Sequence, residues 1–343
     1  IQATTVASAY ISPQTDASVK LAEAAELAYD AGFALPSPRL FPTQRTLMKH
    51  QQDPVVVMAH RGRALLGDDV GSGKGSMFFC GFLSLVQHRI TEHGHAMNQC
   101  FPLVIVTKKS LAQPIERECQ AWFQGCVTHI VQGSKKQNYP DGVQVIICPI
   151  NSLDKHVDDI LALDPQGVIF DESHMVKNPD AKRTQAALAL SKHIQDNCEF
   201  PYTVCASATP MPNRPSELWA QLVITGMNDD IIEHCEAKQS FPHRTKTSFK
   251  NNWTIPVNDR MKFEMRYCQG KPGPFGWDAR GVAHEKELND QLIQGGLIRR
   301  KKNEFITPLP LLHQRFLRCE LDEKTRKEYD VAQQDFSDFI VAS

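Results

Sequence analysis

Residues 67–76, which read GDDVGSGKGS, combine four glycines with a single lysine, between a short apolar stretch and an apolar helical pattern over 77–86. Glycines let a backbone approach phosphates closely, so that amide N–H groups and a helix N-terminus face the anion while the lysine adds positive charge. The literal phosphate-loop pattern fails twice, because Asp68 replaces the first glycine and Gly75 replaces the hydroxyl residue that normally binds magnesium. An ordinary glycine-rich turn is the alternative. The candidate nucleotide-binding residues are Gly71, Ser72, Gly73, Lys74, Gly75 and Ser76, and Ser76 is also a candidate magnesium ligand.

Further along the chain, residues 167–174 read GVIFDESH, an apolar stretch that ends in two carboxylates. Parallel α/β sheets place functional side chains at the carboxyl ends of their strands. Asp171 can hold Mg²⁺, directly or through water, while Glu172 orients and activates the attacking water. The alternative is a helix N-terminus with favourable acids and a surface His174. We therefore interpret Lys74, Asp171 and Glu172 as catalytic residues.

Residues 206–210, which read ASATP, again directly follow an apolar stretch. Small hydroxyl residues there can hydrogen-bond to the acidic strand end and register the phosphate state, although a plain strand-to-loop turn has a similar sequence. We expect His174, Ser207 and Thr209 to couple the nucleotide to the rest of the domain. The three segments form one site only if they meet at the same edge of a sheet.

Such a sheet is predicted by short apolar runs that alternate with helical patterns from about residue 64 to 225. The chain is therefore an α/β protein with a parallel sheet flanked by helices. We divide it into an N-terminal helical leader over 1–40, an α/β lobe over 41–228, a mostly helical or irregular insertion over 229–295, and linker helices over 296–343. The predicted strands are 64–67, 103–107, 143–148, 168–171 and 202–206, and the leader helix is 18–31.

The composition indicates the general class of protein but not the reaction that it carries out. The net charge is −1, so binding to nucleic acid must depend on local clusters, such as 243–271 with seven Lys or Arg against two Asp or Glu. Ten single cysteines without a CxxC pair favour reduced thiols and give no zinc signal. No long apolar run or basic-then-apolar start is present, so we expect a soluble, intracellular protein without a membrane segment.

These motifs together resemble superfamily-two helicases, and within them the Swi2/Snf2 family of double-stranded DNA translocases. GDDVGSGKG stands where that family has DEMGLGKT, DESHMVKN is similar to its DEAHxxKN, and ASATPMPNRPSELW is similar to its TGTPxxNxxxELW. The resemblance implies a RecA-like P-loop lobe that uses ATP and Mg²⁺ and that tracks duplex or branched DNA. LFPTQR resembles the family's Q-motif, which implies that Gln44 reads the adenine edge.

Two further blocks narrow the resemblance. LIRRKKNEFITPLP resembles the family's LRRxKxxVxxLP, which implies a hinge or nucleotide-coupling role for Arg299 and Arg300. The stretch RYCQGKPGPFGWDARGVAHEKEL, over 266–288, is similar to a block of the annealing-helicase (HARP-like) branch. Aromatic residues near it either stack on bases or pack within the insertion; they are Phe263, Tyr267, Phe275 and Trp277.

The departures from the family are as informative as the matches. Gly75 removes the hydroxyl ligand to magnesium, which predicts slower Mg²⁺-dependent turnover than in typical relatives. Pro149 and Ile150 stand where the family has Thr/Ser and Tyr, which weakens one DNA contact by analogy. Only 33 residues follow Pro310, with no second strand–helix series. We expect a longer natural chain, or a partner in trans, to supply the second RecA-like lobe, and weak turnover by this lobe alone.

For DNA phosphates, the candidates are Lys108, Lys109 and Ser110, although the lysines could equally be solvated loop residues. Two other functions stay open at this point. One is an RNA helicase lobe, which the SAT sequence favours and the ELW and RRK blocks oppose. The other is a degenerate nucleotide-binding scaffold, which Gly75 favours and the retained acid pair opposes.

Overall fold

The computed structural model describes residues 15–238, 257–274, 276–305 and 322–342. By internal contacts the chain divides into one unit over Ile1–Phe305 and a second over Ile306–Ser343. In the second unit the described residues form helix α13 (Glu323–Ala342). No helix within the described ranges has the length and apolarity needed to cross a membrane.

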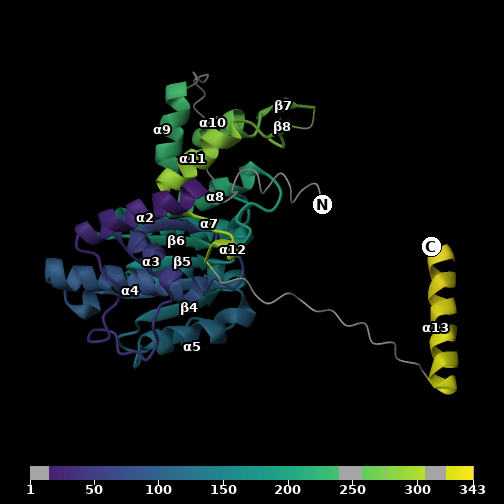
Figure 1. Ribbon diagram of the computed structural model, residues 1–343, viewed down its shortest axis with the longest axis horizontal. Coiled ribbons are helices and arrows are strands. Elements are labelled where there is room, and N and C mark those ends of the chain that lie inside the picture. Colours follow the sequence, from purple (N-terminus) through teal and green to yellow (C-terminus); the bar gives the residue numbers. More distant parts are fainter. Residues whose placement is uncertain (1–14, 239–256, 275, 306–321, 343) are drawn as a thin grey trace. The chain divides into compact units, whose positions relative to one another are not determined.

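A seven-stranded parallel sheet forms the centre of the first unit, in the order β3-β4-β2-β5-β6-β1-β9 (Figure 1). Strand β2 pairs with both β4 and β5, so the carboxyl ends of the central strands lie at one edge. The strands are β1 (Arg63–Leu66), β2 (Leu103–Thr107), β3 (Thr128–Ile130), β4 (Val145–Pro149), β5 (Gly167–Asp171), β6 (Tyr202–Ala206) and β9 (Leu297–Ile298).

All five predicted strands are present, and their ends differ from the prediction by at most two residues. The prediction missed the two edge strands, β3 and β9. Strand β3 is three half-buried residues, and β9 is only two residues long. Strand β3 lacks the continuous burial of the inner strands, and β9, although buried, is too short to form the apolar run on which the prediction depended.

Helices cover both faces of the sheet. One apolar cluster joins side chains of α6, α7 and α8 to one face, and a second joins α3, α4 and α5 to the other. The helices are α2 (Thr15–Asp30), α3 (Lys49–Arg61), α4 (Lys74–His93), α5 (Ala112–Trp122), α6 (Leu153–Leu161), α7 (Lys182–Asn197), α8 (Trp219–Thr225), α9 (Asn228–Lys238), α10 (Val257–Tyr267), α11 (Glu285–Gly295) and α12 (Lys302–Phe305). Short 3₁₀ turns occupy Met97–Cys100, Lys109–Leu111, Ile150–Ser152, Ser173–Val176 and Pro215–Leu218.

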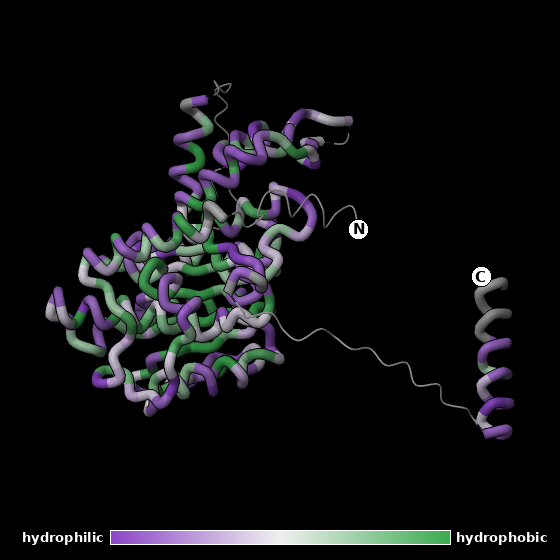
Figure 2. Tube along the Cα trace, in the orientation of Figure 1, coloured by the Kyte–Doolittle hydropathy of each residue, from purple (hydrophilic) through white to green (hydrophobic). Residues whose placement is uncertain are grey.

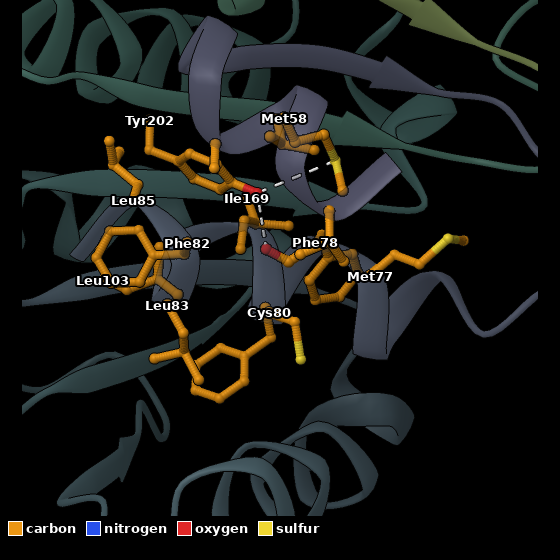
Figure 3. Packing of buried hydrophobic residues seen from close by; sticks show 14 of the residues in the cluster. Met58, Met77, Phe78, Cys80, Phe82, Leu83, Leu85, Leu103, Ile169 and Tyr202 are labelled. Carbon is orange, nitrogen blue, oxygen red and sulfur yellow. Dashed lines mark hydrogen bonds between the residues drawn. The ribbon is translucent and has the colours of Figure 1, made fainter. Parts of the chain in front are cut away.

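The strands are the most continuously hydrophobic part of the chain, and the helices around them alternate hydrophobic and hydrophilic residues (Figure 2), as expected for a sheet covered on both faces. Packing against α4 is close: Tyr202 of β6 is fully buried and donates a hydrogen bond of 2.8 Å to the carbonyl of Phe78 (Figure 3). A Cβ on Gly81 would lie 2.4 Å from the Tyr202 oxygen, so this crossing requires glycine. The contact fixes α4, and with it the segment where α4 begins, against the sheet.

The insertion consists of α9, α10 and α11 with a small antiparallel hairpin, β7 (Lys271–Gly273) and β8 (Gly276–Asp278). The hairpin was not predicted, because its strands are three residues each and mostly exposed. Phe263 and Tyr267 are buried and pack in series on Trp219 of the lobe, with ring centroids 5.5 and 5.2 Å apart. These two rings therefore pack, while Trp277 is partly exposed and Phe275 lies outside the described residues. The domain boundaries at 40, 228 and 295 stay predictions.

Candidate nucleotide-binding site

The glycine-rich loop joins the end of β1 to the start of α4. Gly71 and Gly73 have φ angles of +84° and +80°, a region that side chains with a Cβ rarely adopt. A Cβ on Gly73 would also lie 2.2 Å from the side-chain amide of Gln51. The Ser72 hydroxyl is buried without a hydrogen-bond partner among the described residues. Two left-handed glycines and an unsatisfied hydroxyl donor next to a helix N-terminus suit a phosphate group.

Lys74 is the first residue of α4, and its ammonium group lies over the loop. It donates hydrogen bonds of 2.8 and 3.1 Å to the carbonyls of Asp68 and Asp69. Burial lowers the pKa of Lys74, and the nearby charges of Asp68, Asp171 and Glu172 oppose that shift. The lysine and the acid pair therefore lie close enough to interact electrostatically.

The two carboxylates at the end of β5, Asp171 and Glu172, have different surroundings. Burial raises the pKa of Asp171, partly offset by a 2.9 Å hydrogen bond that its Oδ2 accepts from the Thr107 hydroxyl at the end of β2. Glu172 has a φ of +54°, an uncommon conformation for a residue other than glycine and one that clusters at functional sites. Its carboxylate lies 3.7 Å from Lys108 Nζ and 3.3 Å from His174 Nδ1. Thr107 and Lys108 thus position one carboxylate each.

The third segment reaches the acid pair through a histidine. Nδ1 of His174 lies 3.1 Å from the Ser207 hydroxyl, which also accepts a 3.2 Å hydrogen bond from the Thr209 backbone N–H. Burial lowers the pKa of His174, and Glu172 opposes the shift. The structure brings together Glu172, His174 and Ser207, whereas Thr209 is exposed and takes part through its backbone.

Gln44, which is expected to read the adenine edge, is exposed, and its role stays a prediction. Its neighbours fix it near α5, because the Thr43 hydroxyl donates to the Ala121 carbonyl and Arg45 pairs with Glu118. Gln51, in the first turn of α3, contacts the loop instead: it is buried, donates 3.1 Å to the Ser72 carbonyl and accepts 3.0 Å from the Met48 N–H. The sequence offered a signal for Gln51, since LMKHQ stands nearer to the glycine loop than LFPTQR.

Ser76 also differs from the expectation that it binds magnesium. Its hydroxyl donates a 2.5 Å hydrogen bond to Glu118 of α5, which further accepts bonds from Arg45 and Trp122. Burial alone would raise the pKa of Glu118, but these hydrogen bonds outweigh it and lower the pKa. The serine is therefore held by an ionised carboxylate on α5. At Gly75 an added Cβ would have its nearest neighbour, Glu118 Cγ, at 3.8 Å, so a side chain fits there.

Asp68, which breaks the glycine pattern, points away from the phosphate side of the loop. It is fully buried and forms an ion pair with the guanidinium of Arg300, whose backbone N–H also donates 2.8 Å to Asp68 Oδ1. Arg299 donates to the carbonyls of Gly67 and, at 2.7 Å, Ala208. The two arginines predicted to couple thus attach the end of β9 to the glycine loop.

The candidate DNA-contacting residues follow β2. Lys108 pairs with Glu172, while Lys109 and Ser110 are exposed at the start of a 3₁₀ turn. Pro149 and Ile150, at the end of the neighbouring strand β4, are both buried. This edge of the sheet therefore offers two cations and a hydroxyl, and the apolar pair beside them adds no hydrogen-bonding side chain.

For ATP the residues present fit: a glycine loop with an unsatisfied buried hydroxyl, a lysine and a helix N-terminus match a triphosphate. For Mg²⁺ they supply one oriented carboxylate, Asp171, and no hydroxyl at position 75. Mg²⁺ in such sites takes one or two protein oxygens together with phosphate oxygens and water. No cluster of three or more potential metal ligands exists in the described part of the chain.

Comparison with known proteins agrees with these features. The family model described as SNF2-related domain matches residues 50–340. The chain is 29% identical over 266 residues to the SWI/SNF-related matrix-associated actin-dependent regulator of chromatin subfamily A-like protein 1 of Drosophila melanogaster, covering 77% of this chain and 29% of that protein. It is 25% identical over 276 residues to the human DNA annealing helicase and endonuclease ZRANB3, covering 77% and 21%. The chain thus spans less than a third of the length of these two relatives.

Among solved structures, the Sulfolobus solfataricus SWI2/SNF2 ATPase core in complex with dsDNA matches with a TM-score of 0.54 at 16% sequence identity. The match covers 79% of this chain and 47% of that one, so the shared fold corresponds to about half of the core. The seven-stranded sheet is thereby the RecA-like fold expected from the sequence. The chain belongs to the SNF2-related domain family of helicase-type ATPases.

Proposed function

We propose that this chain is an ATP-binding lobe that uses ATP and Mg²⁺ to drive movement along duplex or branched DNA. One observation carries the proposal: Lys74, Asp171 and Glu172 interact electrostatically near the carboxyl ends of β1 and β5. They lie beside a loop in which Gly71 and Gly73 adopt left-handed backbone conformations. Family membership supports ATP as the nucleotide, and the names of the annealing helicase and the dsDNA-bound core support DNA.

Each residue of the site has a role in this proposal. Backbone amides over 71–73 and the Lys74 ammonium bind the phosphates, which displaces Lys74 from the carbonyls it now contacts. Asp171, oriented by Thr107, holds Mg²⁺, which neutralises charge on the phosphoryl oxygens when it is bound. Glu172 orients the attacking water and accepts its proton, while His174 relays the state of that carboxylate to Ser207.

Turnover by this lobe alone is expected to be poor. In two-lobed motors the nucleotide lies between the lobes, and the second lobe supplies arginines to the γ-phosphate. We propose that a second RecA-like lobe acts with this one, in cis or in trans. Lys108, Lys109 and Ser110 then contact DNA phosphates beside the acid pair, so that DNA binding reaches Glu172 through the Lys108 contact.

A fluorescent ATP analogue titrated against the 343-residue chain, with and without Mg²⁺, tests nucleotide binding. Lys74→Ala should weaken binding at least tenfold, because it removes the cation that faces the outer phosphates. Lys109→Ala is the matched control, since this exposed lysine lies outside the loop and should leave the affinity unchanged. Equal affinities for the wild type and Lys74→Ala would reject the site.

A non-catalytic nucleotide-binding scaffold is the second candidate, and the Ser76–Glu118 hydrogen bond favours it because no hydroxyl of α4 faces the acid pair. Gly75→Thr decides between the two. The structure has room for the side chain, so a catalytic lobe should gain Mg²⁺-dependent affinity and turnover, measured with duplex DNA and with RNA present. A scaffold should bind nucleotide as before and gain neither. Stimulation by RNA rather than duplex DNA would instead indicate an RNA helicase lobe.

A further inference from the structure

A groove of about 710 Å³ lies apart from the nucleotide site, between the loops that follow β5 and β6 and the hairpin of the insertion. Asn178 lies in the first of these loops, and Asn213 and Arg214 lie in the second. Trp277 and Arg280 line it from the hairpin side. Neither the nucleotide site nor the predicted DNA-contacting residues 108–110 form part of this groove.

The acids that line the groove are already neutralised. Glu217 pairs with Lys177 at 2.8 Å and accepts a 2.9 Å hydrogen bond from the Asn213 side chain. Hydrogen bonds from Lys177 and Asn213 lower the pKa of Glu217 despite its burial, which alone would raise it. Asp278 pairs with Arg280 at 2.9 Å.

The third acid, Glu264, is buried and is paired with Arg260 at 2.8 Å. Arg214 remains: it is exposed, and no hydrogen bond or ion pair holds its guanidinium within the described chain. A groove whose acids are each paired and that keeps one unpaired guanidinium attracts an anion. Arginine binds phosphate in a bidentate manner, which makes a phosphate group a suitable anion.

Trp277 is the second recognition element. Its indole N–H donates 2.7 Å to Glu264, and a Cβ on Gly270 would lie 2.7 Å from its ring, so its position is fixed on one edge. Even so, Trp277 is 38% exposed, while the aromatic neighbours Phe263 and Tyr267 are fully buried. An exposed, positioned indole beside an unpaired arginine matches the way proteins bind single-stranded nucleic acid, by stacking on a base and contacting its phosphate.

We propose that this groove binds an unpaired segment of a DNA strand, with Trp277 stacked on a base and Arg214 on a phosphate. The proposal rests on the proposed function for the choice of DNA, and it adds the branched part of the substrate. Bases inside a duplex are stacked on one another, so the indole can reach only a base that is unpaired.

The groove is joined to the nucleotide site by the loops themselves. The Lys177–Glu217 pair bridges the loop after β5 to the loop after β6. Deeper in, Gln221 accepts 2.7 Å from the Ser173 hydroxyl and donates 2.6 Å to the Pro210 carbonyl. These contacts tie together the segments that carry the acid pair and Ser207, so a strand in the groove acts on both.

Fluorescence anisotropy of labelled DNA with the 343-residue chain tests the proposal, without nucleotide and at low salt. A fork with unpaired thymidine arms should bind more than about tenfold more tightly than a blunt duplex of the same length. Trp277→Ala and Arg214→Ala should each remove most of this preference, by about tenfold for the tryptophan, since stacking contributes this much per base. Trp277→Phe should restore part of it, and Arg39→Ala, an exposed arginine outside the groove, should change nothing.

Thermal unfolding and binding of the ATP analogue show whether the variants are folded. Equal loss of affinity for fork and duplex, or unchanged fork binding in both alanine variants, would overturn the groove and leave the nucleotide site untouched. Tighter binding of an RNA fork would overturn the assignment to DNA. Failure of Lys74→Ala to weaken ATP binding would reject the proposed function but would not alter the comparison of fork and duplex.

Discussion

Replacing Arg300 by methionine should be one of the most destabilising single changes in the first unit. Asp68 has no exposed surface, and the Arg300 guanidinium is its ion-pair partner. Without this cation, a buried carboxylate stays next to the glycine loop, and breaking a buried pair in this way typically costs about 3–5 kcal/mol. Arg300 also donates 2.6 Å to the carbonyl of His50 in α3, so the start of that helix loses a contact as well.

The double variant Asp68→Asn with Arg300→Met separates the charge from the packing. An asparagine oxygen can still accept the backbone N–H at position 300, while no buried charge remains. We therefore expect the double variant to regain more than half of the lost free energy of unfolding, with a coupling energy of roughly 1–3 kcal/mol between the sites. Lys192→Met is the matched control, because its pair with Asp196 is more than half exposed and contributes about 0.5 kcal/mol or less.

Urea unfolding followed by tryptophan fluorescence gives the free energies, and titration of the ATP analogue gives the effect on the loop. Lys74 is held by the carbonyl of Asp68, so Arg300→Met should weaken nucleotide binding as well as stability. A loss below about 1 kcal/mol for Arg300→Met, or additive effects in the cycle, would refute the reasoning. In that event the backbone pairing of β9 with β1 would hold the loop, and the ion pair would not.

Two further predictions concern the site. Gln51→Ala should weaken ATP binding severalfold in the titration, because this buried side chain holds the Ser72 carbonyl, whereas Gln44→Ala should not; the reverse result would restore Gln44 as the nucleotide-reading residue. Asp171→Asn should stabilise the nucleotide-free chain at neutral pH. Burial raises the pKa of Asp171 in the folded state, so its ionisation lowers stability as pH rises from the ordinary value of 3.8 through the raised one. In thermal unfolding, the melting temperature of the wild type relative to that of the variant should be lower at pH 7 than at pH 4. An equal difference in melting temperature at the two pH values would contradict this.

The fold was predictable where burial is continuous. The inner strands are apolar and buried over most of their length, so their sequences alone indicated them. The acid pair at the end of β5 followed from the parallel topology. Strand β9 was not predictable, because two residues, Leu297 and Ile298, carry no periodic signal. Their strand conformation comes from pairing with Leu65 and Leu66, which lie more than two hundred residues earlier in the chain.

Residue types at the site were easier to predict than their partners. A hydroxyl one position after Gly75 was a reasonable magnesium candidate, yet Ser76 points to Glu118, a residue on another helix that no local pattern connects to it. The sequence pointed to Gln44, whereas the glutamine that contacts the glycine loop in the structure is Gln51. A short motif matched, but contact with the loop depends on which turn of α3 packs on Ser72, and that is decided by tertiary structure.

Asp68 shows how such a partner changes the interpretation of a residue. In the sequence it is a missing glycine and suggests a weakened loop. In the structure its side chain faces the end of β9, where Arg300 neutralises it and Arg299 holds the carbonyls of Gly67 and Ala208. The segment that follows β9 therefore supports the loop on the side of Asp68, and the backbone N–H of Lys302 donates a 3.0 Å hydrogen bond to the Asp69 carboxylate. A displacement of that segment therefore either breaks these contacts or moves the loop with it. The contacts are thus a physical route by which movement after β9 and occupancy of the phosphate loop affect each other.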